Sequence, residues 1–163
     1  MMGRTRVDLS AEAARHGDIL QSDYEDTYYN VTLKNIDLLA YVDESCPELD
    51  FLFHADDDIL LIPSNGAHHL NQLKEGEVSM TGCKWGPDVP PIRDISNKYY
   101  ANTLMAPDKF PAYLSGAAIF YRADAVKAMI PVRKEVPLIH MSDVFLGQLL
   151  QRAQVHHNQM LRR

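Results

Sequence analysis

The feature that most constrains the fold of this chain is a run of three aspartates, Asp56, Asp57 and Asp58, between two apolar segments. Residues 50–53 precede the run and residues 59–62 follow it. Like charges this close together are costly unless something, such as a bound cation, balances them. We therefore predict a strand, an acidic turn and a second short strand at this place.

Helical and strand patterns alternate along the rest of the chain, whose length suits one domain. Apolar spacing predicts helices over residues 10–15, 30–42, 65–73, 123–129 and 142–152. It predicts further strands over residues 18–20, 78–85 and 117–121. Gly17, Pro47 and Pro131 are expected to end the first, second and fourth helices. The alternation indicates a single α/β domain, residues 1–163, with a mixed sheet.

Residues 86–111 show no clear periodicity and are rich in proline and polar residues. They also carry the aromatic side chains of Tyr99, Tyr100 and Phe110. A segment of this length without regular structure is usually functional, so we expect part of a binding site here.

Composition excludes some classes of function. Sixteen basic and twenty-two acidic residues give a net charge of −6, which argues against nucleic acid as a partner. No apolar run approaches the ~18 residues of a membrane span, and no signal peptide is visible. Cys46 and Cys83 could pair in a secretory compartment or stay reduced, and we prefer buried thiols. The triplet at Asn30 could be glycosylated only in the secretory pathway.

The aspartate run is a candidate metal site. Oxygen ligands alone favour Mg²⁺, Mn²⁺ or Ca²⁺. In a strand-like stretch Asp56 and Asp58 point to the same side, so a metal or a ribose could meet both, while Asp57 points away. A solvated acidic loop is the alternative, and the apolar flanks do not decide between the two.

Asp143 is a candidate general base, because Ser142 and Asp143 open a helix with an apolar face. From position alone, a role in capping the helix is the preferred interpretation. The histidines show no i, i+4 pair, so a zinc site is not expected. His156 or His157 could still supply one ligand to a metal held mainly by aspartates.

Seven blocks in a fixed order make a far stronger signal than any of these residues alone. They are HGDIL (16–20), DTYYNVTLK (26–34), Cys46, FLFHADDD (51–58), PIRDISNKYY (91–100), FPAYLSG (110–116) and SDVFLG (142–147). In this order they resemble the β-1,3-galactosyltransferase and β-1,3-N-acetylglucosaminyltransferase family, family 31 of the glycosyltransferases. The resemblance covers nearly all of residues 12–155.

The resemblance implies a fold and an activity. The fold would be a GT-A-like nucleotide-sugar transferase fold with a mixed central sheet, here without its first βαβ portion. The activity would be transfer of a hexose or N-acetylhexosamine from a UDP-sugar to a glycan acceptor on protein or lipid. It would invert the sugar carbon, form a β-1,3 linkage and use a divalent cation, usually Mn²⁺. Family members are usually type II membrane proteins of the Golgi lumen, held by an anchor that these residues do not contain.

The resemblance also implies roles for individual residues. Asp58 would hold the metal, Asp56 would face the metal or the ribose, and Asp143 would deprotonate the acceptor hydroxyl. The donor or acceptor cleft would be lined by Asp57, Lys98, Tyr99, Tyr100 and a turn formed by Ser115 and Gly116.

Some positions depart from the family pattern. Ser142 replaces an acidic residue, His54 replaces a lysine, Leu114 stands where many members have cysteine, and residues 117–118 replace a glycine-rich run. The family's front portion, with its first strand, has no counterpart here. We therefore expect an open sheet edge near residues 18–20 or 50–53, weak UDP binding and a tendency to aggregate.

Two alternatives stay open beside the enzyme. The chain could be an inactive shortened relative that binds a sugar, a metal or a partner. A metal-dependent glycoside hydrolase is a more distant alternative, because hydrolases need two carboxylates flanking one bond.

Overall fold

A four-stranded mixed sheet forms the centre of the computed structural model, which describes residues 9–71 and 80–159. The strands are β1 (Phe51–Ala55), β2 (Met80–Trp85), β3 (Tyr113–Arg122) and β4 (His157–Gln159). Their order is β1-β3-β2-β4. β3 pairs with β1 and β2 in antiparallel fashion, and β2 pairs with β4 in parallel. The predicted α/β class with a mixed sheet is therefore confirmed.

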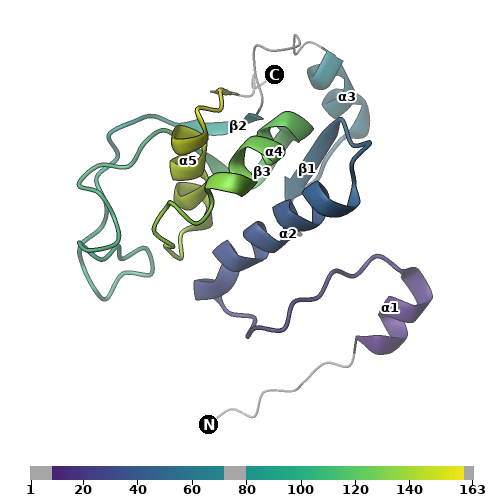
Figure 1. The fold of residues 1–163 in the computed structure, drawn as a ribbon, viewed down its shortest axis with the longest axis horizontal. Helices are drawn as coiled ribbons and strands as arrows, with labels where there is room; N and C mark the ends of the chain where they lie inside the picture. The colour runs from purple at the N-terminus through teal and green to yellow at the C-terminus, as the bar shows by residue number, and fades with distance from the viewer. Residues whose placement is uncertain (1–8, 72–79, 160–163) are drawn as a thin grey trace.

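Helices α2 (Val31–Ser45), α4 (Ala123–Val132) and α5 (Ser142–Ala153) pack together on one face of this sheet. Figure 1 shows the three of them in front of the strands. α5 lies directly on β3 at Gly147, where a Cβ atom would stand only 2.5 Å from the Tyr113 Cβ. The absence of a side chain at this glycine thus allows the close contact between α5 and β3.

β3 divides the apolar residues between the two faces of the sheet. Ile119 and Tyr121 belong to the core under the helices and are almost fully buried. Phe120 points to the other face, as expected for alternating side chains. There its ring lies 4.5 Å from that of Phe53 and 6.1 Å from that of His69 on α3 (Pro63–Asn71).

The two short apolar strands predicted from sequence are wrong. Residues 18–20 follow α1 (Ser10–His16) and have no regular structure. α1 does end at Gly17, with φ 66°, as predicted, but it has no buried residues. Residues 59–62 are exposed and irregular. An apolar run becomes a strand only when a neighbouring strand supplies hydrogen bonds, and in the described residues neither run has one.

Two predicted boundaries are also wrong. α4 continues through Pro131 and ends at Val132, because a proline in the last turn disturbs few intrahelical bonds. β3 begins at Tyr113, so Ser115 and Gly116 lie within a strand and form no turn. The short strand β4 was not predicted. Parts of the predicted helix 65–73 and strand 78–85, namely residues 72, 73, 78 and 79, lie outside the described residues.

β1 lies at one end of the described sheet, where β3 is its partner. The prediction that the aspartate run ends a central strand is therefore wrong for the described part of the chain. The expected open edge is found at β1. An edge strand leaves a row of N–H and C=O groups unpaired, and β1 is only half-buried along its whole length.

Candidate active site

A cavity of about 700 Å³ opens where β1, β3 and the start of α5 meet. Its wall includes two aspartates that are far apart in the sequence, Asp56 after β1 and Asp143 in α5. Cavities of this size are typical of small-molecule sites. Of the residues that sequence reasoning selected, Asp56, Asp143, Ser115, Gly116 and Tyr99 line it.

Asp56 is placed by the end of β1. Its backbone N–H donates to the carbonyl of Ala117 on β3 at 3.1 Å, so the pairing of the two strands reaches the aspartate. His54, two residues earlier, lines the same cavity because alternate residues of a strand share a face. The chain then turns through Asp57 and Asp58, and the Ile59 N–H donates to the Asp56 carbonyl at 3.2 Å.

This turn overturns the expectation that Asp56 and Asp58 face one cleft. The expectation assumed that strand alternation continues through Asp58, but a turn breaks the alternation. All three aspartates are exposed, and of the three only Asp56 lines the cavity.

Asp143 is placed by the first turn of α5, as predicted. Its Oδ1 accepts a hydrogen bond from the Val144 N–H at 2.8 Å. Burial raises the pKa of this carboxyl, although the hydrogen bond acts in the opposite direction. A carboxylate in a less polar environment than water is a stronger base, which suits proton transfer.

β3 sets the separation of the two aspartates. A Cβ atom at Gly116 would stand 3.9 Å from the Asp143 Cβ, and the next residue, Ala117, bonds to Asp56. Two adjacent residues of β3 therefore contact the two aspartate-containing segments: Gly116 lies beside Asp143, and Ala117 is hydrogen-bonded to Asp56. Ser115 and Gly116 do line the site, from a strand and not from a turn.

Aromatic side chains that were not selected from sequence also line this cavity. Trp85 and Tyr113 face each other across β2 and β3, with ring centroids 6.3 Å apart and an angle of 16° between the rings. The chain has a single tryptophan, and 52% of it is exposed. The position of this only tryptophan, next to an irregular and proline-rich segment, was the sequence signal that could have identified Trp85 as a site residue.

His54 brings an unusual polar atom to the site. Its Nδ1 is buried and has no hydrogen-bond partner among the residues that the structure describes. Burial lowers the pKa of the ring, although Asp56 acts in the opposite direction. Buried polar atoms without a partner are uncommon in folded proteins.

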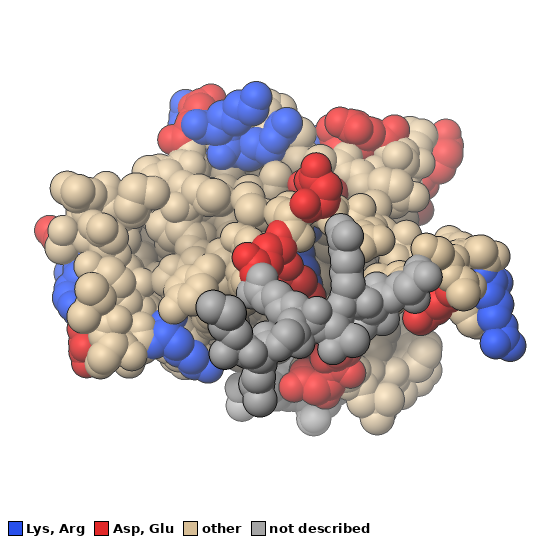
Figure 2. All heavy atoms as spheres, turned by 90° about the horizontal axis from the view of Figure 1, so that it is seen from below, with Lys and Arg blue, Asp and Glu red and all other residues tan. Residues whose placement is uncertain are grey.

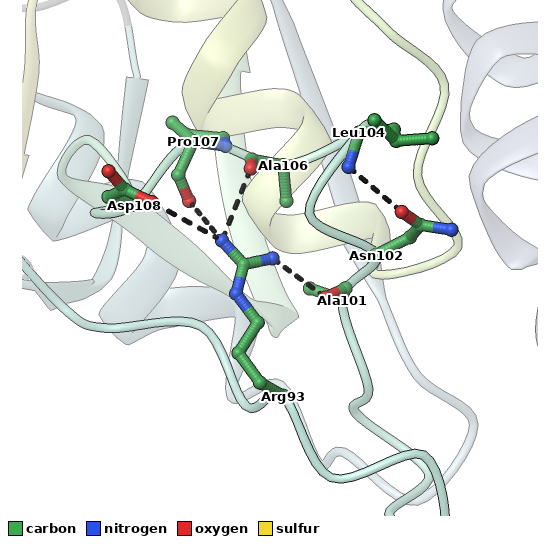
Figure 3. A network of polar contacts seen from close by, with 7 residues as sticks. All are labelled: Arg93, Ala101, Asn102, Leu104, Ala106, Pro107 and Asp108. Carbon is green, nitrogen blue, oxygen red and sulfur yellow. Dashed lines mark hydrogen bonds and ion pairs between the residues drawn. The ribbon is translucent and has the colours of Figure 1, made fainter.

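The irregular segment 86–111 forms another part of the wall, beside residues of α2, and is held by Arg93. Figure 3 shows its guanidinium group donating to the carbonyls of Ala101, Ala106 and Pro107, at 2.7, 3.3 and 3.1 Å. Tyr99, from this segment, lines the cavity. Lys98 and Tyr100 line a smaller neighbouring cavity instead.

Comparison with known proteins identifies the family. A family model described as galactosyltransferase matches residues 3–161. The chain belongs to the galactosyltransferase family. The resemblance drawn from the seven ordered blocks is thereby confirmed.

Several members of the galactosyltransferase family are similar to most of this chain. Over 89% of its own length, this chain is 34% identical to the mouse acetylgalactosaminyl-O-glycosyl-glycoprotein beta-1,3-N-acetylglucosaminyltransferase. It is 31% identical to the human N-acetyllactosaminide beta-1,3-N-acetylglucosaminyltransferase 2 over 88%, and 30% identical to the human beta-1,3-galactosyltransferase 5 over 91%. The matched regions cover only 37%, 36% and 48% of those relatives.

The donor set of this galactosyltransferase-family site suits a hard cation that is shared with a substrate. In the described ranges, no group of three or more histidine, cysteine, aspartate or glutamate side chains could hold a metal ion. Mg²⁺ and similar cations are commonly held by one or two carboxylates together with substrate phosphates. Of the three aspartates only Asp56 lines the cavity and could supply such a carboxylate, and neither His156 nor His157 lines it.

Two surface properties complete the description of this family member. None of the helices in residues 9–71 and 80–159 is long and apolar enough to cross a membrane. On the face that Figure 2 shows, lysine and arginine side chains of the described residues form separate groups, with acidic groups between them. The described residues visible on that face therefore form no continuous basic patch of the kind that binds nucleic acid.

Proposed function

We propose that this protein is a β-1,3-glycosyltransferase that transfers a hexose or N-acetylhexosamine from a UDP-sugar to a hydroxyl group of a glycan. The observation that carries the proposal is the pair Asp56 and Asp143 in one cavity, held by adjacent residues of β3. The family membership and the names of the similar proteins support the same reaction class.

Asp143 would act as the general base. Its Oδ2 accepts the proton of the acceptor hydroxyl, since Oδ1 is already bonded to the Val144 N–H. The acceptor oxygen then forms a bond to the anomeric carbon of the donor sugar. On the opposite side the bond from that carbon to the phosphate oxygen breaks, and its electron pair leaves with UDP. Attack opposite to the leaving group inverts the configuration at the anomeric carbon.

Asp56 would hold a divalent cation, of which Mn²⁺ is the expected one. Such a cation, when bound, neutralises charge on the diphosphate leaving group. Trp85 and Tyr113 would offer flat apolar surfaces to the C–H face of a sugar ring. The proposal includes a GT-A-like fold and, by family resemblance, a place in the Golgi lumen.

The first test is UDP binding, followed by the fluorescence of Trp85, because this only tryptophan lines the cavity. We expect UDP to change the fluorescence only when Mn²⁺ is present. Asp56→Asn is expected to weaken this binding at least tenfold, and Asp58→Asn tests whether the second carboxylate takes part. Glu48→Gln removes one exposed charge that does not line the cavity, and it serves as the control.

The result also separates the enzyme from its alternative. Binding that is equally strong without Mn²⁺, or unchanged in Asp56→Asn, would contradict the cation site. Binding of UDP and a glycan without any sugar transfer would instead support a sugar-binding relative that has lost activity.

A further inference from the structure

Thr32, in the first turn of α2, is a buried polar residue that the proposed mechanism does not use. Only 1% of it is exposed, and its hydroxyl donates to the carbonyl of Ile139 at 2.7 Å, across 107 positions of sequence. A threonine hydroxyl on a helix can bond to a carbonyl one turn earlier in the same helix. This hydroxyl instead joins α2 to the part of the chain that enters α5.

The bonded carbonyl belongs to a short connection, residues 139–141, that leads directly into α5. Ile139 and Met141 are both buried in the apolar core. The Met141 carbonyl accepts the Phe145 N–H at 2.9 Å, as the residue before a helix normally does. The connection is therefore fixed by α2 at one end and by the first turn of α5 at the other.

The position of the Asp143 carboxylate depends on this connection. Asp143 is the second residue of α5, and its carboxylate is bonded within its own helical turn, to the Val144 N–H. The direction of the side chain therefore follows the orientation of that turn. The close contact of α5 with β3 lies one turn further along, at Gly147, so the first turn also needs support from the connection before it.

We propose that Thr32 is a positioning residue for Asp143: its hydroxyl holds the Ile139 carbonyl and thereby fixes the first turn of α5 where the Asp143 carboxylate can reach the acceptor hydroxyl. Thr32 does not line the cavity, so it acts only through the connection. A small displacement is sufficient, because a misplacement of about 1 Å can lower a rate about a hundredfold. This inference rests on the proposed function in taking Asp143 as the base.

The test varies the donor at position 32 through Thr32→Ser, Thr32→Cys and Thr32→Val. Serine keeps the hydroxyl, cysteine has only a weak S–H donor, and valine keeps the shape without a donor. We expect kcat for sugar transfer to fall in that order, by roughly tenfold to a hundredfold in Thr32→Val, with KM for the UDP-sugar changed by less than about twofold. A residue that only stabilises the fold would lower the melting temperature without this dependence of kcat on the donor.

Thr81→Val is the matched control. Thr81 is also 1% exposed, and its hydroxyl lies 3.2 Å from Nε2 of His69, but it belongs to β2 and does not line the cavity. We expect a similar loss of melting temperature with a normal kcat. A normal kcat in Thr32→Val, or an equal fall of kcat in Thr81→Val, would overturn the inference.

An NMR measurement separates this inference from the proposed function. The Phe145 N–H reports on the start of α5, and the Val144 N–H reports on the Asp143 carboxylate. We expect faster hydrogen exchange at Phe145 and a shifted Val144 amide resonance in Thr32→Val, but neither change in Thr81→Val. If Thr32→Val does not fold, Thr32→Cys compared with Thr32→Ser decides in the same way. Wild-type protein that transfers no sugar contradicts the proposed function, whereas unchanged amide signals contradict the positioning role.

Discussion

Asp143 has a role in the proposed chemistry that opposes its contribution to stability. Burial raises the pKa of its carboxyl, so the folded state binds the proton more strongly than the unfolded state does. The contribution of this group to the free energy of unfolding therefore decreases as the pH rises from the ordinary aspartate pKa to the raised pKa of the folded state. Above the raised pKa the contribution stays at its lower value. At neutral pH the ionised Asp143 would destabilise the fold while serving as the base.

Asp143→Asn is expected to stabilise the fold and to abolish transfer. The amide has no charge to desolvate and keeps the oxygen that accepts the Val144 N–H. At pH 7 we expect a gain of roughly 0.5–2 kcal/mol in urea unfolding, a typical size for a stabilising substitution. The gain should disappear below the ordinary aspartate pKa. Transfer should fall about 10²–10⁴-fold, the usual contribution of a general base. Normal turnover, or lower stability at pH 7, would show that Asp143 only caps the helix.

Two glycines provide a comparison between packing and function. At Gly147 an added Cβ atom would stand 2.5 Å from the Tyr113 Cβ and 3.0 Å from the Ala112 carbonyl oxygen. We expect Gly147→Ala to cost about 1–3 kcal/mol of stability, because overpacking outweighs the roughly 1 kcal/mol that alanine gains in a helix. Thermal unfolding measures this loss.

Gly116→Ala is expected to affect function and not stability. There the contacts to Asp143 and Ser142 would be 3.9 Å, which is an ordinary distance, so stability should change by less than about 0.5 kcal/mol. The added methyl group would nevertheless enter the cavity beside Asp143, and we expect weaker glycan binding and slower transfer. A stable variant with unchanged activity would place the reacting sugar away from Gly116.

At the scale of elements, the segment 86–111 has a defined conformation without helix or long strand. Three side chains accept the backbone N–H two residues on: Asp94 from Ser96, Asn97 from Tyr99 and Asn102 from Leu104. Such local bonds stabilise successive turns. Arg93 then joins the turns by binding carbonyls of three residues in the second half of the segment.

Arg93→Lys is expected to loosen this segment although the charge is kept. A lysine ammonium lacks the planar group that reaches three carbonyls at once. We expect faster hydrogen exchange in residues 94–107 and weaker binding of glycans, with a stability loss of about 1–3 kcal/mol. Arg15→Lys, at an exposed position on α1, is the control. Exchange that stays slow in Arg93→Lys would mean that the local turns alone hold the segment.

At the scale of the whole molecule, the open edge and the apolar surface lie close together in the chain. β1 has an unpaired edge in the described sheet, and residues 59–62 follow it with exposed apolar side chains. Edges of this kind pair with other chains, and apolar patches assist them. Aggregation and weak UDP binding of the 163-residue chain remain predictions.

Leu60→Lys is expected to reduce aggregation. Leu60 is 89% exposed, so the substitution costs little folding energy, and a charge beside an edge strand opposes pairing. Leu104→Lys adds the same charge at a position that is also 89% exposed but lies in the segment 86–111. Light scattering during heating should show a higher onset temperature for Leu60→Lys than for Leu104→Lys. Equal onsets would exclude a special role for the edge near β1.

Local pattern was sufficient for most elements, whereas the preference for Asp56 and Asp143 as site residues came from the family resemblance. α2 and α5 were predictable because their apolar residues repeat at helical spacing, which depends only on neighbours within a few turns. β1 and its acidic end were predictable because apolar residues and charges separate sharply in the sequence. The ordered blocks added the family, which no single residue could show.

Only the tertiary structure decided how these parts meet. Whether residues 18–20 and 59–62 form strands depended on hydrogen-bond partners far away in the chain, and within residues 9–71 and 80–159 neither segment has one. The acidic turn was predicted from sequence, but only the structure showed that Asp58 does not line the cavity. The distance between Asp56 and Asp143 is set by Gly116 and Ala117 on β3, through strand pairing and the packing of α5. Sequence by itself determined which side chains carry charge and which segments bury apolar surface, whereas the register between distant segments decided which charges share a site.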